Sequence, residues 1–187
     1  VVNNHGNPGW MTGMMLNDIN PGSGIRELNR QVLDHFSEMY RTTGTGLPGH
    51  FVIFTGGTND IKPGVDLPPE TAIDNLRQMA ALIRSQGMRP IFITLPPYQA
   101  NSSSPPGSPL DLDRQVINDY WRTTGLSSGE TEAIIDSESA FNVSTYGDLH
   151  DDAFHDGENG DATHPDNDGS EVMGLEARDV LLPLMAA

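Results

Sequence analysis

Three short apolar runs separated by helix-like segments constrain the fold of this chain more than any other feature. The runs cover 51–55, 90–94 and 133–136, and the first is continuously apolar, as expected for a strand covered on both faces. Strands that alternate with helices predict a mostly parallel sheet. We therefore expect one α/β domain over 1–187, a doubly wound sandwich whose ligands bind at the carboxyl ends of the strands.

The predicted helices rest on hydrophobic residues that recur at helical spacing. They cover the segments 25–41, 70–86, 110–124 and 170–182. One face of the second helix is formed by Ile73, Leu76, Met79, Ala80 and Ile83, and Gly87 is expected to end this helix. The inward residues of the third helix are expected to be Leu112, Val116, Ile117 and Tyr120. Ser170 is expected to cap the last helix.

Between these elements, loops are predicted over 3–11, 56–69, 95–109 and 137–168, and Val1-Val2 is interpreted as the end of a strand. The third loop is rich in Ser and Pro and is expected to be too polar for the core. Asp136 ends the last short strand, where a capping role is favoured over a catalytic one.

Net charge and cysteine content exclude several classes of partner and site. The formal net charge is -16 at pH 7, so the surface would repel a phosphate backbone and we expect no nucleic-acid partner. The chain has no cysteine, which excludes disulfides, thiolate metal ligands and thiol nucleophiles. No apolar run approaches the length of a membrane span. The compartment stays open, and a secreted bacterial protein is the interpretation we favour.

Asn59 is the first candidate for chemistry. It lies in the sequence GTND (57–60), four residues beyond Thr55 at the end of the first apolar run. A carboxamide NH2 at this place can donate a hydrogen bond to an oxyanion that forms over the sheet edge. The residues of this sequence are also common turn formers, so a turn without catalytic function is the alternative.

Asp161 and His164 form a second candidate pair, in the sequence DATHP (161–165). Their spacing lets the carboxylate bind Nδ1 of the imidazole and fix its tautomer, which leaves Nε2 to act as a base. The alternative is one more histidine in an acidic, solvated loop, alongside His150 and His155.

These two blocks resemble signature blocks of the SGNH (GDSL-type) hydrolase superfamily. A third block, GNPGWMT (6–12), resembles the family's second block, in which a glycine backbone N–H enters the oxyanion hole. The order of the three blocks matches the superfamily across nearly the whole chain. The resemblance implies a flavodoxin-like three-layer α/β/α sandwich with a catalytic pair, Asp161 and His164, and an oxyanion hole formed by Gly9 and Asn59.

The family's opening block, a strand that ends in Gly-Asp-Ser and carries the nucleophile, is missing from this sequence. Ser23 follows no predicted strand and Ser137 follows the wrong one, so neither is expected to be the nucleophile. In the strand order 2-1-3-4-5, the absent first strand belongs beside 51–55, where its loss would leave backbone groups unpaired. We therefore expect a preceding segment or a separate N-terminal peptide to carry the serine.

The resemblance implies a serine ester hydrolase that needs no cofactor. The Gly-x-Pro-Gly-Trp form of the second block is similar to branches that deacetylate carbohydrates, so an acetylated carbohydrate or a short acyl ester is the expected substrate. Trp10 is a candidate platform for a sugar ring, with a core position at least equally compatible with its size. The alternatives are a lipase, thioesterase or acyltransferase on the same scaffold, or a non-catalytic carbohydrate-binding relative that has lost its serine.

A calcium-dependent structural module is a further alternative, because acidic residues crowd one predicted loop. They are Asp148, Asp151, Asp152, Asp156, Glu158, Asp161, Asp166 and Asp168. Oxygen ligands at this density are able to bind Ca2+, but the spacing of a twelve-residue calcium loop is not present. A solvated acidic loop is therefore the preferred interpretation.

Overall fold

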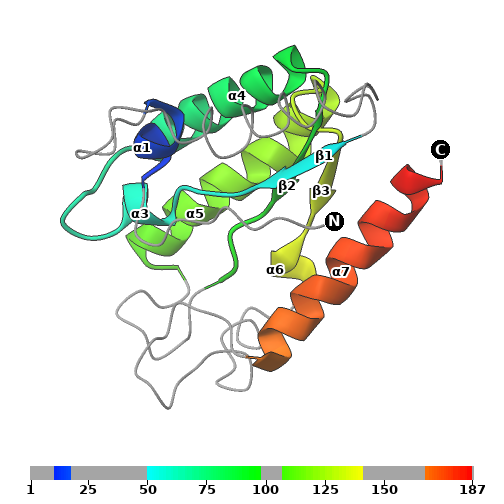
Figure 1. The fold of residues 1–187 in the computed structure, drawn as a ribbon. Helices are drawn as coiled ribbons and strands as arrows, with labels where there is room; N and C mark the ends of the chain where they lie inside the picture. The colour runs from blue at the N-terminus through cyan, green and yellow to red at the C-terminus, as the bar shows by residue number, and fades with distance from the viewer. Residues whose placement is uncertain (1–10, 18–49, 98–106, 141–166, 187) are drawn as a thin grey trace.

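A parallel sheet of three strands forms the centre of the molecule. The computed structural model describes residues 11–17, 50–97, 107–140 and 167–186. Within them the strands are β1 (Phe51–Phe54), β2 (Arg89–Ile93) and β3 (Ala133–Ile135), and they pair in the order β1-β2-β3 (Figure 1). All three match the predicted segments, although β2 begins one residue earlier than predicted, and both pairings are parallel. The predicted α/β class is therefore confirmed, and this arrangement is compatible with a flavodoxin-like fold.

Helix α4 (Pro69–Ser85) covers one face of the sheet, as its sequence predicts. Proline in the first turn suits a helix start, because its missing N–H would have no intrahelical partner there. The predicted apolar face is buried along its whole length. Gly87 terminates the helix two residues after Ser85: its φ of +77° is left-handed and its N–H donates to the Arg84 carbonyl at 2.8 Å.

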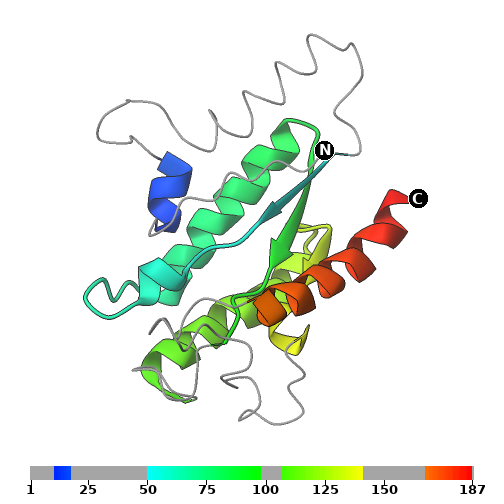
Figure 2. The same ribbon diagram turned by 60° about the horizontal axis from the view of Figure 1, so that its bottom comes forward.

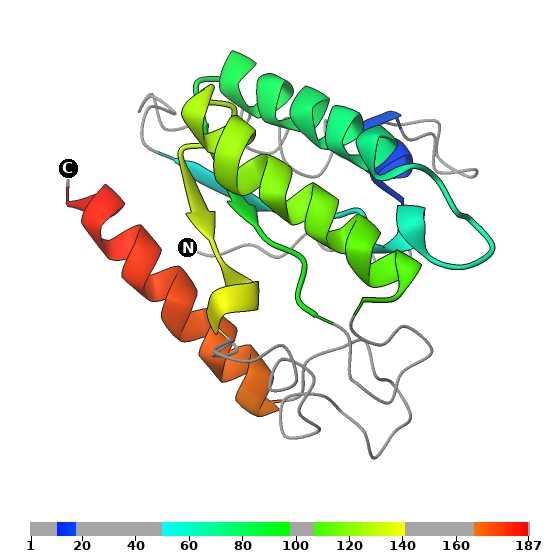
Figure 3. The same ribbon diagram turned by 180° about the vertical axis from the view of Figure 1, so that it is seen from behind.

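Helix α5 (Pro109–Tyr120) lies beside α4 on the same face, as Figure 3 shows from behind. Ser108 caps its start, because the Ser108 hydroxyl accepts from the Asp111 N–H at 3.3 Å. The predicted inward face of this helix was wrong at two positions, because Leu112 is 52 % exposed and Val116 is 43 % exposed. The buried face instead carries a charged pair, Asp111 and Arg114, followed by Ile117 and Asn118.

The helix continues after Tyr120 as a π-turn, η2 (Trp121–Gly125), which places Trp121 in the core. The indole ring stacks on Phe92 with 4.7 Å between centroids and meets Phe54 edge to face at 5.5 Å. Gly125 is required by this packing, because a Cβ there would lie 2.5 Å from Trp121 Cε3. The aromatic cluster joins β1, β2 and η2 in one core.

The opposite face of the sheet is covered at the β3 end. Helix α7 (Asn167–Met185) contacts β3 and α6 (Ser137–Ala140), and Figure 2 shows it on the side of the sheet away from α4. Ile53 of β1 is 42 % exposed, so the expected cover on both faces of that strand is wrong at this position. The reason is that α7 packs along β3, at the far edge of the sheet from β1.

Two further predictions were wrong, one about the start of a helix and one about burial in a loop. α7 begins at Asn167, so Ser170 lies within the helix and does not cap it. The segment that follows β2 was predicted to be too polar for the core, yet Leu95 is only 3 % exposed. Its side chain packs in the core with Phe92 and Ile117.

The predicted strand at 1–2 and helix at 25–41 lie outside the described residues. So does all of the predicted loop 137–168 except its beginning, which forms α6, and its last two residues, which belong to α7. No described helix combines the length and the apolar character that crossing a membrane requires.

Candidate functional site

Asn59 lies directly beyond the carboxyl end of β1, in the single helical turn α3 (Thr58–Ile61). The segment 56–69 was predicted as a loop, but the N–H groups of Asp60 and Ile61 donate to the Gly57 carbonyl at 3.0 and 3.2 Å and close a turn of helix. Gly57 has a φ of +120°, and a Cβ there would lie 2.9 Å from Ile117 Cδ1. Glycine at this position therefore lets the turn pack closely against α5.

The Asn59 carboxamide is bound by the residue that follows α3. Lys62 Nζ donates to Asn59 Oδ1 at 3.1 Å, and both residues are half-buried. An ammonium group can only donate, so this contact requires the carbonyl oxygen of the amide on the lysine side.

Asp60 connects α3 with α1 (Thr12–Asn17), a helix that the sequence pattern did not indicate. The fully buried carboxylate accepts from the Thr12 N–H at 3.0 Å and from the Thr12 hydroxyl at 2.6 Å. The same hydroxyl accepts from Asn75 Nδ2 of α4 at 3.1 Å. The carboxylate thus satisfies the first amide of α1, where negative charge is also favoured by the helix dipole.

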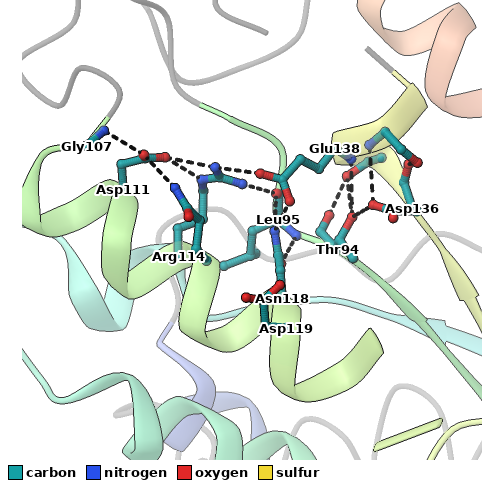
Figure 4. A network of polar contacts seen from close by, with 12 residues as sticks. Thr94, Leu95, Gly107, Asp111, Arg114, Asn118, Asp119, Asp136 and Glu138 are labelled. Carbon is teal, nitrogen blue, oxygen red and sulfur yellow. Dashed lines mark hydrogen bonds and ion pairs between the residues drawn. The ribbon is translucent and has the colours of Figure 1, made fainter. Parts of the chain in front are cut away.

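A buried polar network lies at the carboxyl ends of β2 and β3 (Figure 4). Its centre is Arg114, whose side chain is fully buried. The guanidinium donates to Asp111 Oδ1 at 2.8 and 3.0 Å and to the Leu95 carbonyl at 3.1 Å, and it pairs with Glu138 Oε1 at 2.8 Å. One side chain of α5 therefore holds the segment after β2 and the segment after β3 together.

Arg122 of the π-turn binds two carboxylates at the same edge. Its Nε and one terminal nitrogen form a fork on Asp136 at 2.9 and 2.6 Å, and that nitrogen also reaches Glu138 Oε2 at 2.6 Å. Burial alone would raise the pKa of Asp136, but the hydrogen bonds and charge of Arg122 outweigh it and lower the pKa. Asp136 also accepts from the Ser139 N–H at 3.3 Å, so the capping role that the sequence favoured is observed.

Ser137, which the sequence analysis set aside as a nucleophile, is fully buried at this edge. Its hydroxyl donates to the Thr94 carbonyl and also contacts the Thr94 hydroxyl at 3.1 Å. A buried hydroxyl engaged in this way has a structural role.

The other predicted site residues lie outside the described residues: Gly9, Trp10, Asp161 and His164. The acidic stretch considered for calcium also lies outside them, except for Asp168 at the start of α7. Across 11–17, 50–97, 107–140 and 167–186, no three His, Asp or Glu side chains are grouped in a way that would hold a metal ion.

Sequence reasoning missed Thr12, Lys62 and the Asp111–Arg114–Glu138 network. Thr12 closes the block 6–12 but gives no sign of a partner 48 residues away. The sequence could have indicated Lys62, because it is the only lysine in a chain with 26 acidic residues and lies three residues after Asn59.

Comparison with known proteins adds no relative to these observations: the chain matches no protein-family model, no curated protein and no solved structure.

Proposed function

We propose that the protein is a serine ester hydrolase of the SGNH type, acting on an acetylated carbohydrate or a short acyl ester. The observation that carries the proposal is the clamp between Asp60 and Thr12. It joins the GTND block to Thr12, the last residue of the block 6–12, beside the carboxyl end of β1. A site at that edge is what a parallel α/β sheet favours.

In this mechanism, a serine hydroxyl attacks the ester carbonyl while His164 accepts its proton and Asp161 orients the imidazole. The tetrahedral adduct carries a negative oxygen, which the Asn59 carboxamide and the Gly9 N–H would stabilise. Gly9 precedes Thr12 by three residues, so chain length alone keeps their Cα atoms within about 11 Å. The attacking serine is expected to come from outside these 187 residues.

Ester hydrolysis by the full-length gene product tests the proposal, with p-nitrophenyl acetate as the substrate. Asn59→Ala should lower kcat by about 100- to 1000-fold, the range for removal of one oxyanion donor. His164→Ala should lower kcat at least as strongly, and His155→Ala is the matched control in the same stretch of sequence. Full activity in both the Asn59 and the His164 variants would refute the proposal.

The nucleophile can be identified chemically. A fluorophosphonate probe forms a covalent bond with an activated serine, and peptide mapping by mass spectrometry then locates the modified residue. We expect one labelled serine in a segment outside this chain, with labelling lost in His164→Ala. A protein that binds acetylated oligosaccharides but neither hydrolyses the ester nor takes the probe would instead be a non-catalytic relative.

A further inference from the structure

We propose that Lys62 is a positioning residue of the oxyanion hole, whose ammonium group fixes the orientation of the Asn59 carboxamide. The inference rests on the proposed function, because the orientation of this amide matters for catalysis only if its NH2 group donates to an oxyanion. The contact that carries it is the hydrogen bond from Lys62 Nζ to Asn59 Oδ1 at 3.1 Å.

The chemistry of this pair permits one orientation of the amide. A carboxamide has an accepting oxygen on one side and a donating NH2 group on the other, whereas an ammonium group has donors only. A flipped amide would place two sets of donors against each other. Lys62 therefore holds the oxygen on its own side and turns the NH2 group away from the lysine.

The backbone of α3 makes this contact a local one. Lys62 follows the last residue of the turn, so the two side chains stand three positions apart, at a spacing that brings side chains together on a helix surface. Asp60, between them in sequence, is fully buried and bonded to Thr12. The backbone of the turn is thus fixed through Asp60, and the amide of Asn59 is fixed separately through Lys62.

The charge of Lys62 has a second effect. The positive ammonium group next to the carbonyl oxygen polarises the amide and makes its N–H groups stronger donors. Both residues are half-buried, which screens this interaction less than bulk water would. In a chain with a net charge of -16, a cation beside the oxyanion donor also offsets the negative field that would oppose a developing oxyanion.

Three variants of the full-length gene product test the role through kinetics. Lys62→Met keeps the length of the side chain without a donor, and Lys62→Arg keeps a donor. Arg84→Met, at an exposed position in the last turn of α4, removes the same charge elsewhere. We expect Lys62→Met to lower kcat by about tenfold, equivalent to about 1.4 kcal/mol, with KM nearly unchanged. Lys62→Arg should keep most of the wild-type kcat, and Arg84→Met should have the wild-type kcat and KM.

A measurement without substrate provides the second test. The side-chain NH2 resonances of Asn59 are identified in a 15N-labelled sample by their loss in Asn59→Asp. They should shift in Lys62→Met and stay in place in Arg84→Met.

Two outcomes would overturn the inference. If Asn59→Ala is inactive while Lys62→Met keeps the wild-type kcat, the role of Lys62 is wrong and the proposed function stands. If Asn59→Ala itself keeps the wild-type kcat, the oxyanion role of Asn59 fails and the inference fails with it.

Discussion

Replacement of Arg114 by methionine tests whether the buried network at the carboxyl edge holds the fold together. The change removes the hydrogen bonds to Asp111 and to the Leu95 carbonyl and the ion pair with Glu138, and it leaves two carboxylates buried with less compensation. Loss of one partner from a buried ion pair costs about 3–5 kcal/mol. Asp111 keeps bonds from Gly107 N–H and Gln115 at 2.9 Å, and Glu138 keeps Arg122 at 2.6 Å, so we expect the lower end of this range.

Urea denaturation followed by far-UV circular dichroism measures this loss. With a slope of about 2 kcal/mol per M, a loss of about 3 kcal/mol moves the midpoint down by about 1.5 M. Arg77→Met is the matched control, because Arg77 pairs with Glu130 at 2.9 Å on the surface and a surface pair contributes little. If both variants shift the midpoint equally, the argument that burial makes the Arg114 network important is refuted.

Three further predictions concern individual groups. The pKa of Asp136 lies below its ordinary value of 3.8. Its contribution to stability is therefore present above pH 3.8 and is lost as the pH falls toward the folded pKa. Asp136→Asn should flatten this part of the curve of stability against pH, measured by urea titrations at several pH values. Burial, together with the hydrogen bond to Glu130, raises the pKa of Tyr120 to about 12, so its contribution is present below about pH 10 and is lost as the pH rises toward 12. Absorbance at 295 nm should follow this titration, and Glu130→Gln should move it toward pH 10. Gly125→Ala should cost about 1–3 kcal/mol in urea denaturation, because its Cβ collides with the Trp121 ring, and a wild-type midpoint would contradict this packing.

The sheet and α4 were predictable from the sequence because their burial follows from apolar residues alone. Ile73, Leu76 and Ile83 recur at helical spacing and are buried where that spacing places them. The short apolar runs became strands in the predicted places, because bulky β-branched and aromatic residues fit a covered sheet.

α5 was predicted in place, but two of its four predicted inward residues are exposed, and the reason is physical. Its buried face carries Asp111 and Arg114, which compensate each other, and Arg114 also binds Leu95 and Glu138, which lie outside the helix. Hydrophobic periodicity cannot detect such a face, so it assigned Leu112 and Val116 to the core. The π-turn at Trp121 adds a further shift that a regular period of 3.6 residues does not contain.

The candidate site was predictable only as a set of motifs. GTND was interpreted as a functional turn, and Asn59 lies in a turn of helix beyond β1, but its bond with Lys62 required the structure. The part played by Asp60 also escaped sequence reasoning, because Gly, Asn and Asp favour turns in many settings.

The Asp60–Thr12 contact has a consequence for how the protein unfolds. The contact joins residues that are 48 positions apart in sequence. Helix α1, which carries Thr12, packs mainly against α4. Detaching α1 uncovers Leu16 and Met15, whereas separating the strands would uncover the aromatic core as well, so detachment requires less free energy. Under the proposed function, mild denaturant should therefore abolish ester hydrolysis while the far-UV circular dichroism signal still reports an intact sheet.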